Sequence, residues 1–357
     1  MTTLFLYLTL IYGISEAPPF YDNKIDLLYY LSEENQQIPI DNAADWQLRK
    51  HHILENMQLV MGKLPEIDHA SSSRYEIVAE QSFPSYRRQT IHYKVDGWDT
   101  VPAFLFLPNN QDGKEKKKPA VLCLHPTSPI GKRVCAGEGN KSNRNYAEEL
   151  VKRGYITLAP DYPGFGEYVE ARQRLYEEGY VSCTMKGIVN HICAIDLLES
   201  LPQVDPERIG CIGHSLGGHN TLFVSVFDTR IKVAVSSCGF TLFPKYKNGD
   251  ITGWTHDGYM PRIDTVYKKD PAKIPFDFSE VLAAIAPRTV FICAPIKDDN
   301  FEVSGVKDAV HAARSIFALL HAEDNLRVSY PDAEHDFPLE TRLEAYELID
   351  IVLKNNE

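Results

Sequence analysis

Residues 213–217, Gly-His-Ser-Leu-Gly, restrict the possible folds of this chain more than any other stretch. The largely apolar residues 208–212 before them are typical of a buried strand, and residues 218–226 after them suit a helix. Where a strand turns directly into a helix around a serine, the backbone leaves almost no space for neighbouring side chains, which accounts for glycine at 213 and 217. The pattern predicts a sharp turn that lifts the Ser215 hydroxyl clear of a sheet.

The rest of the chain places this turn among alternating strands and helices. Strand-like runs occupy 120–124, 155–159, 208–212, 231–236, 289–293 and 326–330, and helix-like segments occupy 142–153, 184–200, 218–226, 278–285, 303–320 and 339–353. Three earlier strand-like runs, 74–80, 88–95 and 101–107, suit an antiparallel leading edge. The alternation predicts an α/β fold with a mostly parallel central sheet covered by helices on both faces. A serine turn between strand and helix in such a sheet is the nucleophile elbow of the α/β-hydrolase fold.

Two regions differ from this alternation. Residues 18–73 are expected to form an N-terminal helical extension, in which a helix over 43–61 is capped by Asn42 or Asp41 and stopped by Gly62. Residues 74–357 are then the catalytic domain. Within it, residues 239–276 are aromatic, rich in Gly and Pro and without period, so we expect a short lid-like insert there.

The first 17 residues predict a signal peptide. Residues 4–14 are an apolar run of suitable length, and Ser15 and Ala17 supply the small residues before a cleavage site. No Lys or Arg precedes Leu4, so the only positive charge there is the amino terminus. A signal peptide implies a secreted or periplasmic protein. The alternative is a short strand or helix lying on the core of a cytoplasmic protein.

Charge and cysteine usage exclude several classes of partner. The net charge of −12 argues against nucleic acid and against anionic membranes. The chain has no internal run of about 18 apolar residues, the length that a transmembrane helix needs. Its seven cysteines show neither the spacing of a metal site nor a disulfide framework, although a single disulfide remains open. We therefore expect no metal and no cofactor.

A serine nucleophile needs a general base, and in α/β-hydrolases the serine, the acid and the histidine follow in that order. Of the histidines after Ser215, His335 alone lies in a loop that follows a late strand. The acid should follow the preceding strand, where Asp298 and Asp299 are adjacent. We favour Asp298, with Asp299 as the alternative. Its carboxylate would bind the Nδ1–H of the histidine and fix the ring for proton transfer.

An oxyanion hole requires two N–H donors beside the serine. One should be the backbone N–H of Leu216, and the other should come from the loop that follows residues 120–124. Pro126 in that loop has no N–H to donate. Thr127 is therefore the expected second donor, with Ser128 as the alternative.

Aromatic residues are candidates for the substrate wall. Tyr162 follows a strand and should face the site. The insert supplies further candidates, namely Phe240, Tyr246, Trp254 and Tyr259 for stacking on a sugar ring, and His256 or Arg262 for polar contacts. The alternative is that these side chains pack a tight loop and a short lid.

Four motifs carry a family resemblance. They are Gly-His-Ser-Leu-Gly-Gly-His at 213–219, Asp-Tyr-Pro-Gly-Phe-Gly-Glu at 161–167, Ala-Pro-Ile-Lys-Asp-Asp-Asn-Phe at 294–301 and Glu-His-Asp-Phe-Pro at 334–338. With the segment 44–65, they resemble the bacterial dienelactone-hydrolase-like and acetylxylan-esterase-like serine esterases of the α/β-hydrolase superfamily. The resemblance covers nearly the whole chain after residue 25. In that family's acid loop the aspartate stands two residues before Asn-Phe, which falls on Asp298.

The resemblance implies a serine esterase, often exported and often linked to polysaccharide use. The chain departs from named members, because dienelactone hydrolases have cysteine at the position of Ser215. The best-known acetylxylan esterases have Gln, and glucuronoyl esterases Arg, at the position of Leu216. We predict a serine carboxylic ester hydrolase that acts through an acyl-enzyme on acetyl or methyl esters of carbohydrates, whether small molecules or polysaccharides. The alternatives are a prolyl-oligopeptidase-like peptidase and a non-enzymatic binding protein on a hydrolase scaffold.

Overall fold

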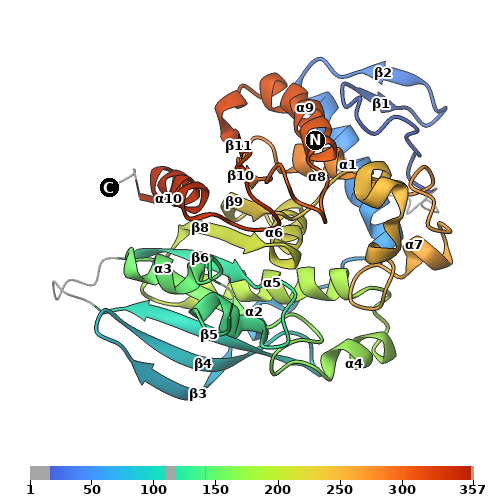
Figure 1. The fold of residues 1–357 in the computed structure, drawn as a ribbon. Helices are drawn as coiled ribbons and strands as arrows, with labels where there is room; N and C mark the ends of the chain where they lie inside the picture. Colours follow the sequence, from blue (N-terminus) through green and yellow to red (C-terminus); the bar gives the residue numbers. More distant parts are fainter. Residues whose placement is uncertain (1–16, 110–116, 141, 355–357) are drawn as a thin grey trace, which may run out of the picture.

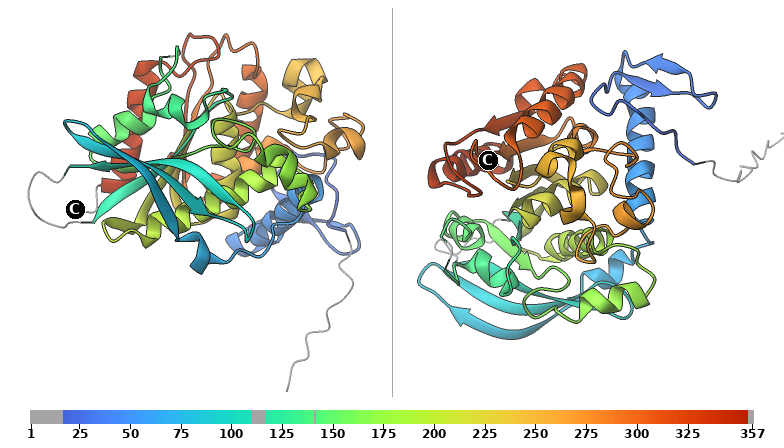
Figure 2. Two further views of the ribbon diagram at one scale, coloured as in Figure 1. Left: turned by 90° about the horizontal axis from the view of Figure 1, so that it is seen from below. Right: turned by 45° about the vertical axis from the view of Figure 1, so that its right-hand side comes forward.

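The computed structural model describes residues 17–109, 117–140 and 142–354. A nine-stranded sheet crosses the molecule, and helices cover both of its faces (Figure 1 and Figure 2). The predicted signal peptide, apart from Ala17, lies outside the described residues. Among the described helices, none combines the length and the apolar character needed to cross a bilayer.

The strands of this sheet confirm the predicted topology. They are β3 (Tyr75–Ser82), β4 (Tyr86–Lys94), β5 (Thr100–Pro108), β6 (Lys118–Leu124), β7 (Ile156–Pro160), β8 (Val204–His214), β9 (Ile231–Ser237), β10 (Thr289–Cys293) and β11 (Leu326–Ser329). Their order across the sheet is β11-β10-β9-β8-β6-β7-β5-β4-β3. The pairs between β7 and β11 are parallel, whereas β3, β4, β5 and β7 pair antiparallel. This is the α/β-hydrolase fold with an antiparallel leading edge.

Helices on the two faces build two separate cores. One face is covered by α3 (Tyr146–Lys152) and α10 (Leu339–Lys354), and the other by α1 (Ala43–Met61), α5 (Cys183–Ser200), α6 (Leu216–Phe227), α8 (Phe278–Ile285) and α9 (Val303–Leu319). Along β6, Val121 and Cys123 belong to the first core, and Leu122 and Leu124 to the second. Successive side chains of a strand point to opposite faces, so a strand that is buried on both sides must be apolar throughout.

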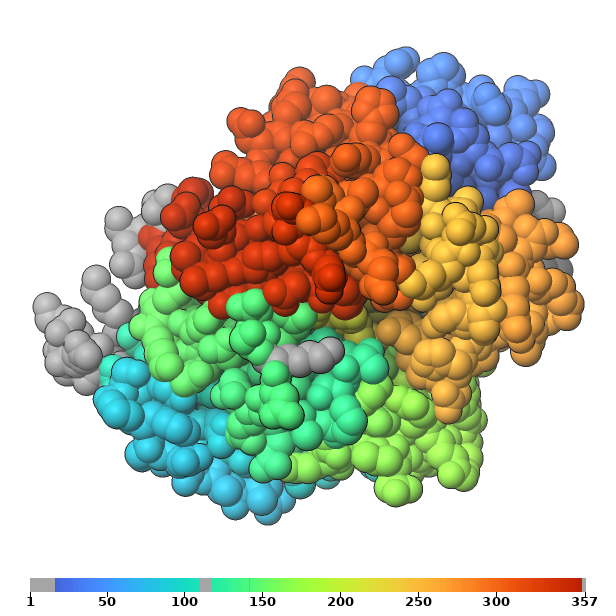
Figure 3. All heavy atoms as spheres, viewed as in Figure 1, coloured from blue at the N-terminus to red at the C-terminus, as the bar shows by residue number. Residues whose placement is uncertain are grey.

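Shorter helices occupy the connections. They are α2 (His69–Ser72), α4 (Ala171–Glu177) and α7 (Arg262–Thr265), with the 3₁₀ turns η1 (Gly131–Ala136), η2 (Phe243–Gly249), η3 (Ile251–Trp254) and η4 (Glu323–Asn325). The predicted insert, 239–276, contains η2, η3 and α7 and has no long element. It lies beside the N-terminal extension (Figure 3), where the Arg262 guanidinium donates to the carbonyl of Leu59 at 2.9 Å.

The N-terminal extension is less helical than we predicted. Before α1 it forms an antiparallel hairpin of β1 (Tyr29–Leu31) and β2 (Gln37–Pro39). Three-residue strands are too short to show alternation, which is why the sequence does not reveal them. Helix α1 spans the predicted residues, because the Asn42 side chain caps its first turn and Gly62, at φ 96°, ends it.

A buried ion pair joins this extension to α8, one of the helices that cover the central sheet. Arg49 of α1 donates to Glu280 of α8 at 2.6 Å, and both side chains are almost completely buried. Glu280 also accepts the N–H of Asp277 and completes a capping box at the start of α8. Burial raises the pKa of Glu280, and the charge of Arg49 opposes that rise. The charge of Arg49 therefore helps to keep the buried carboxyl group of Glu280 ionised.

We expect Arg49→Met to lower the free energy of unfolding by about 3–5 kcal/mol, because the buried Glu280 would lose its ion-pair partner. The double variant Arg49→Met/Glu280→Gln should recover most of this loss, since the amide oxygen can still accept the N–H of Asp277. Chemical denaturation of wild type and both variants checks the expectation. Equal losses in the single and double variants would contradict it.

Candidate active site

The candidate site lies where the carboxyl ends of neighbouring parallel strands meet. Ser215 follows β8, Asp298 lies in the loop after β10, and His335 lies in the loop after β11. The structure brings these three predicted side chains together, and we call them the triad. The edge beyond the carboxyl ends of the strands is the general location of ligand sites in open α/β sheets.

The backbone at Ser215 is held in a strained turn. Ser215 has φ 56° and ψ −118°, outside the regions that residues with a Cβ usually adopt. Its N–H donates to the carbonyl of Ser237 at 2.7 Å. A Cβ at Gly213 would lie 2.2 Å from the Gly217 carbonyl oxygen, and one at Gly217 would lie 1.9 Å from the Leu124 carbonyl oxygen. Both positions therefore require glycine, as the sequence predicted.

Hydrogen bonds connect the triad from acid to serine. His335 Nδ1 lies 2.9 and 3.0 Å from the two carboxylate oxygens of Asp298, and His335 Nε2 lies 2.9 Å from Ser215 Oγ. With the proton on Nδ1, the ring donates to Asp298 and its Nε2 accepts from the Ser215 hydroxyl. The arrangement can thus take the serine proton when the oxygen attacks an electrophile.

The acid of the triad is buried and well supplied with donors. Burial acts to raise the pKa of Asp298, but the bonds from His335 and from the N–H groups of Phe301 and Asn300 outweigh it and hold the pKa below its usual value. The carboxyl group therefore stays ionised at neutral and mildly acidic pH. The alternative acid, Asp299, is exposed, and its backbone carbonyl accepts from Lys247.

The histidine loop is fastened by residues that the sequence analysis missed. Arg144 donates to Asp336 at 2.5 Å and to the carbonyl of His335 at 3.3 Å, and Asn143 donates to Asp336 at 2.8 Å. Burial acts to raise the pKa of Asp336, but Arg144 and Asn143 hold it below its usual value. The sequence signals for this pair were an acidic residue next to His335 and a basic residue near the start of the predicted helix 142–153. Neither signal identifies the pair without the fold.

The predicted oxyanion loop is oriented by a buried histidine. His125 Nε2 accepts from the N–H of Tyr162 at 2.9 Å, so its Nδ1 carries the proton and donates to the carbonyl of Pro126 at 2.7 Å. In a trans peptide the C=O and the N–H point in opposite directions. The N–H of Thr127 is therefore turned away from His125, and Thr127 lines the cavity at Ser215. Burial lowers the pKa of His125 and keeps the ring neutral.

A cavity of about 450 Å³ opens at the triad. Ser215 and His335 line it, together with the loop 126–130 and a set of polar side chains, Glu138, Asn140, Arg144, His214 and Asn300. These polar residues could form hydrogen bonds to hydroxyl groups of a ligand. A larger cavity, of about 880 Å³, lies near the end of α1 and includes Trp98 and Tyr180 in its wall, but it contains no residue of the triad.

The four predicted substrate-binding residues do not line the cavity at Ser215. Tyr162 and Trp254 are each only 2% exposed and pack into the core, because their rings bury apolar area there. His256 is exposed in the insert, and the ring of Tyr259 packs against it and against Trp254. The prediction that Tyr162 faces the site and the prediction that Trp254 stacks on a sugar ring are therefore wrong. Tyr259 still approaches the site, because its hydroxyl lies close enough to the Thr127 side chain for Thr127 to oppose the rise in its pKa that burial causes.

Comparison with known proteins identifies the family. The model of the prolyl oligopeptidase family matches residues 142–349, more than half of the chain and all of the triad. The chain belongs to the prolyl oligopeptidase family. It is a serine hydrolase with the α/β-hydrolase fold, which confirms the predicted superfamily and enzyme class.

Individual relatives extend the likeness beyond the matched segment. YtaP of Bacillus subtilis, a protein named as a hydrolase, is 29% identical over 252 residues, which cover 67% of this chain and 79% of YtaP. Carbohydrate esterase MZ0003, from an unknown prokaryotic organism, is 24% identical over 202 residues, about half of each protein. A glucuronoyl esterase from Solibacter usitatus has the same fold, with a TM-score of 0.68 and 18% identity over 93% of this chain and 98% of that one.

The close backbone contact at Gly217 predicts how a substitution there changes stability. Gly217→Ala should lower the free energy of unfolding by about 1–3 kcal/mol or more, because β6 must move away from the added methyl group. It should also slow labelling of Ser215 by an organophosphorus probe. Gly97→Ala is the matched control, since nothing lies within 4 Å of its Cβ position, and its unfolding free energy should stay within about 0.5 kcal/mol of wild type. Equal stability of the two variants would contradict the proposed close approach.

Proposed function

We propose that the chain is a serine esterase that cleaves acetyl or methyl esters of carbohydrates through an acyl-enzyme. Ser215 is the nucleophile, His335 the general base and Asp298 the orienting acid. The observation that carries the proposal is the continuous set of hydrogen bonds from Asp298 through His335 to Ser215, each 2.9–3.0 Å long, beside a cavity.

The reaction uses the two ring nitrogens of His335 for different tasks. Nε2 takes the proton as Ser215 Oγ attacks the ester carbonyl, and Asp298 stabilises the imidazolium that forms. The imidazolium then protonates the leaving alcohol, and the acyl-enzyme remains. Water, activated by the same nitrogen, attacks the acyl-enzyme and releases the acid. The serine proton returns, so the enzyme is unchanged after each turnover.

Negative charge on the former carbonyl oxygen needs two preorganised donors. Leu216 begins α6, so its N–H has no acceptor within the helix, and Thr127 presents the second N–H from the loop oriented by His125. The hydroxyl of Tyr259 lies beside the Thr127 side chain, so the insert approaches this loop. In this proposal Tyr259 is a positioning residue of the oxyanion hole and does not stack on a sugar.

Polar side chains in the wall of the cavity, which is otherwise built from apolar residues such as Ile130 and Val134, support a carbohydrate ester as substrate. Charged and amide side chains such as Arg144, Glu138 and Asn300 suit hydroxyl groups better than a long aliphatic chain. The relatives named as carbohydrate and glucuronoyl esterases add support for this substrate class. Partners other than the ester substrate, whether nucleic acid or membrane, do not suit a net charge of −12.

Peptide hydrolysis is the second candidate function, because the matching family takes its name from peptidases. Against it, the described residues before 142 form a hairpin, two helices, four sheet strands and a 3₁₀ turn, and they contain no propeller domain that could gate access to the site. A substrate comparison separates the two functions.

We expect wild type to hydrolyse 4-nitrophenyl acetate and to release acetate from acetylated xylan or methanol from pectin. Ser215→Ala should remove nearly all of this activity, because the nucleophile is lost. Asp298→Asn should lower kcat by about 10⁴-fold, since the ring would be held in the wrong tautomer, while Asp299→Asn serves as the matched control with near-normal kcat. Cleavage of a dipeptide anilide but of none of the three esters would move the assignment to the peptidase.

The proposed steps use protein groups and water without a metal, which makes a prediction about chelation. Ester hydrolysis should keep its full rate after dialysis against a chelator such as EDTA. The measurement is the initial rate with 4-nitrophenyl acetate before and after dialysis. A loss of rate that Ca²⁺ or Mg²⁺ restores would contradict the mechanism.

We also propose that the enzyme is exported. A polysaccharide substrate lies outside the cell, and residues 1–17 have the composition of a signal peptide. Expression of the full chain in a bacterial host, followed by mass measurement of the mature protein, tests the proposal. Cleavage after Ala17 is the expected result.

A further inference from the structure

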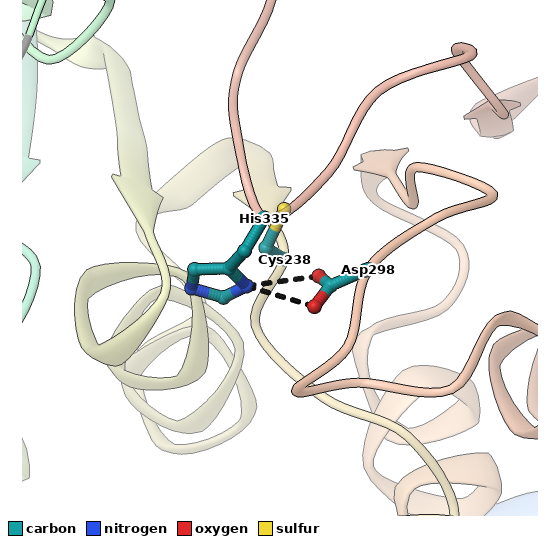
Figure 4. A group of neighbouring side chains, drawn as sticks. All are labelled: Cys238, Asp298 and His335. Atoms are coloured by element: carbon teal, nitrogen blue, oxygen red, sulfur yellow. Dashed lines mark hydrogen bonds and ion pairs between the residues drawn. The ribbon is translucent and has the colours of Figure 1, made fainter.

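A cysteine that the proposed reaction does not use lies against the triad. The Sγ of Cys238, a carboxylate oxygen of Asp298 and a ring nitrogen of His335 all lie within 4.8 Å of one another. Figure 4 shows the three side chains gathered from three separate loops, with Asp298 and His335 directed at each other. Cys238 and Asp298 are buried, and the His335 side chain is 26% exposed.

The backbone fixes this thiol in place. Cys238 directly follows β9 and has φ 48°, a left-handed conformation that costs a residue with a Cβ about 1–2 kcal/mol. Its N–H donates to the carbonyl of Cys293 at 2.9 Å, and its Sγ lies 3.3 Å from the carbonyl of Asp336. The thiol of Cys238 is therefore held against the loop that carries His335. All seven cysteines of the chain are free, so this thiol is available as a ligand.

A thiolate, an imidazole and a carboxylate are the three ligand types that zinc takes in proteins. Zinc binds sulfur at about 2.3 Å, and nitrogen and oxygen at about 2.0–2.2 Å, so its ligand atoms in a tetrahedral site are roughly 3.4–3.7 Å apart. The group around Cys238 lies inside 4.8 Å, and the shortest separation, between Asp298 and His335, is 2.9 Å. Shifts of about 1 Å or less would therefore form a three-ligand site with one open position.

We propose that Cys238, Asp298 and His335 form an inhibitory binding site for a thiophilic divalent cation, represented by Zn²⁺. Binding releases the proton of the Cys238 thiol to solvent, and the His335 proton moves from Nδ1 to Nε2, so that Nδ1 binds the metal as a neutral imidazole and Nε2 can no longer accept the serine proton. The metal then takes the carboxylate and the imidazole away from proton transfer, so the occupied enzyme is inactive. The cation is a regulator at this site and takes no part in the reaction.

The activity readout rests on the proposed esterase function, so metal binding is tested first without it. Untagged Ser215→Ala protein, which lacks the nucleophile, is titrated with Co²⁺ and Cd²⁺ after removal of metals. We expect sulfur-to-metal charge-transfer absorbance at one equivalent, lost in Ser215→Ala/Cys238→Ser and kept in Ser215→Ala/Cys293→Ser. Cys293 is the matched control, because it is a buried free cysteine whose backbone bonds to that of Cys238, but its thiol is not in the ligand group. No absorbance, or absorbance that survives the loss of Cys238, would overturn the site whatever the enzyme hydrolyses.

Inhibition is then measured on the active enzyme with 4-nitrophenyl acetate. Zn²⁺ should abolish hydrolysis after preincubation, and EDTA should restore the rate. Cys238→Ser should raise the inhibitory Zn²⁺ concentration by about 10- to 100-fold or more, since even outer partners of zinc ligands are worth that much. Each variant is compared with its own zinc-free rate, and Cys238→Ala replaces Cys238→Ser if the latter does not fold. Equal inhibition of wild type and the Cys238 variant would overturn the proposal.

Discussion

The contact between the serine turn and β6 sets the position of everything else in the site. Gly217 lies so close to the carbonyl of Leu124 that even one added carbon would overlap it. Thr127, the proposed oxyanion donor, lies three residues after Leu124 in the loop that follows the same strand. Because the two backbones touch, the distance between nucleophile and donor loop is fixed by main chain and does not depend on side-chain rotamers. Such preorganisation is what stabilisation of a developing charge requires.

The sequence predicts the elements well where local signals agree. Helix α1 matches the predicted 43–61 because its cap, Asn42, and its terminating glycine are both encoded in the chain. Helix α3 begins four residues later than predicted, since Asn143 adopts φ 66° and cannot join a helix. That conformation lets Asn143 and Arg144 reach Asp336. These contacts join distant parts of the chain, so no local sequence pattern could reveal them.

The same contrast explains which site residues could be predicted. The carboxyl ends of parallel strands meet at one edge, so chain order is enough to place Ser215, Asp298 and His335 together. No comparable rule predicts which way the side chains of an aperiodic segment such as the insert point. The insert places Trp254 in the core and Tyr259 against Thr127, although both rings look alike in the sequence. Which ring faces a ligand depends on packing against α6 and α8, which only the fold determines.

The loop of His335, the proposed general base, has little secondary structure of its own, so other groups must hold it. Asp298 fixes the ring of His335, Arg144 bonds its carbonyl, and Cys238 lies against the carbonyl of the next residue, Asp336. These contacts come from the loop after β10, from the segment before α3 and from the end of β9. Holding a loop from three directions brings a carboxylate and a thiol to the same imidazole. The geometry that keeps the proposed base in place therefore also assembles a set of metal ligands, and a metal bound there would block proton transfer.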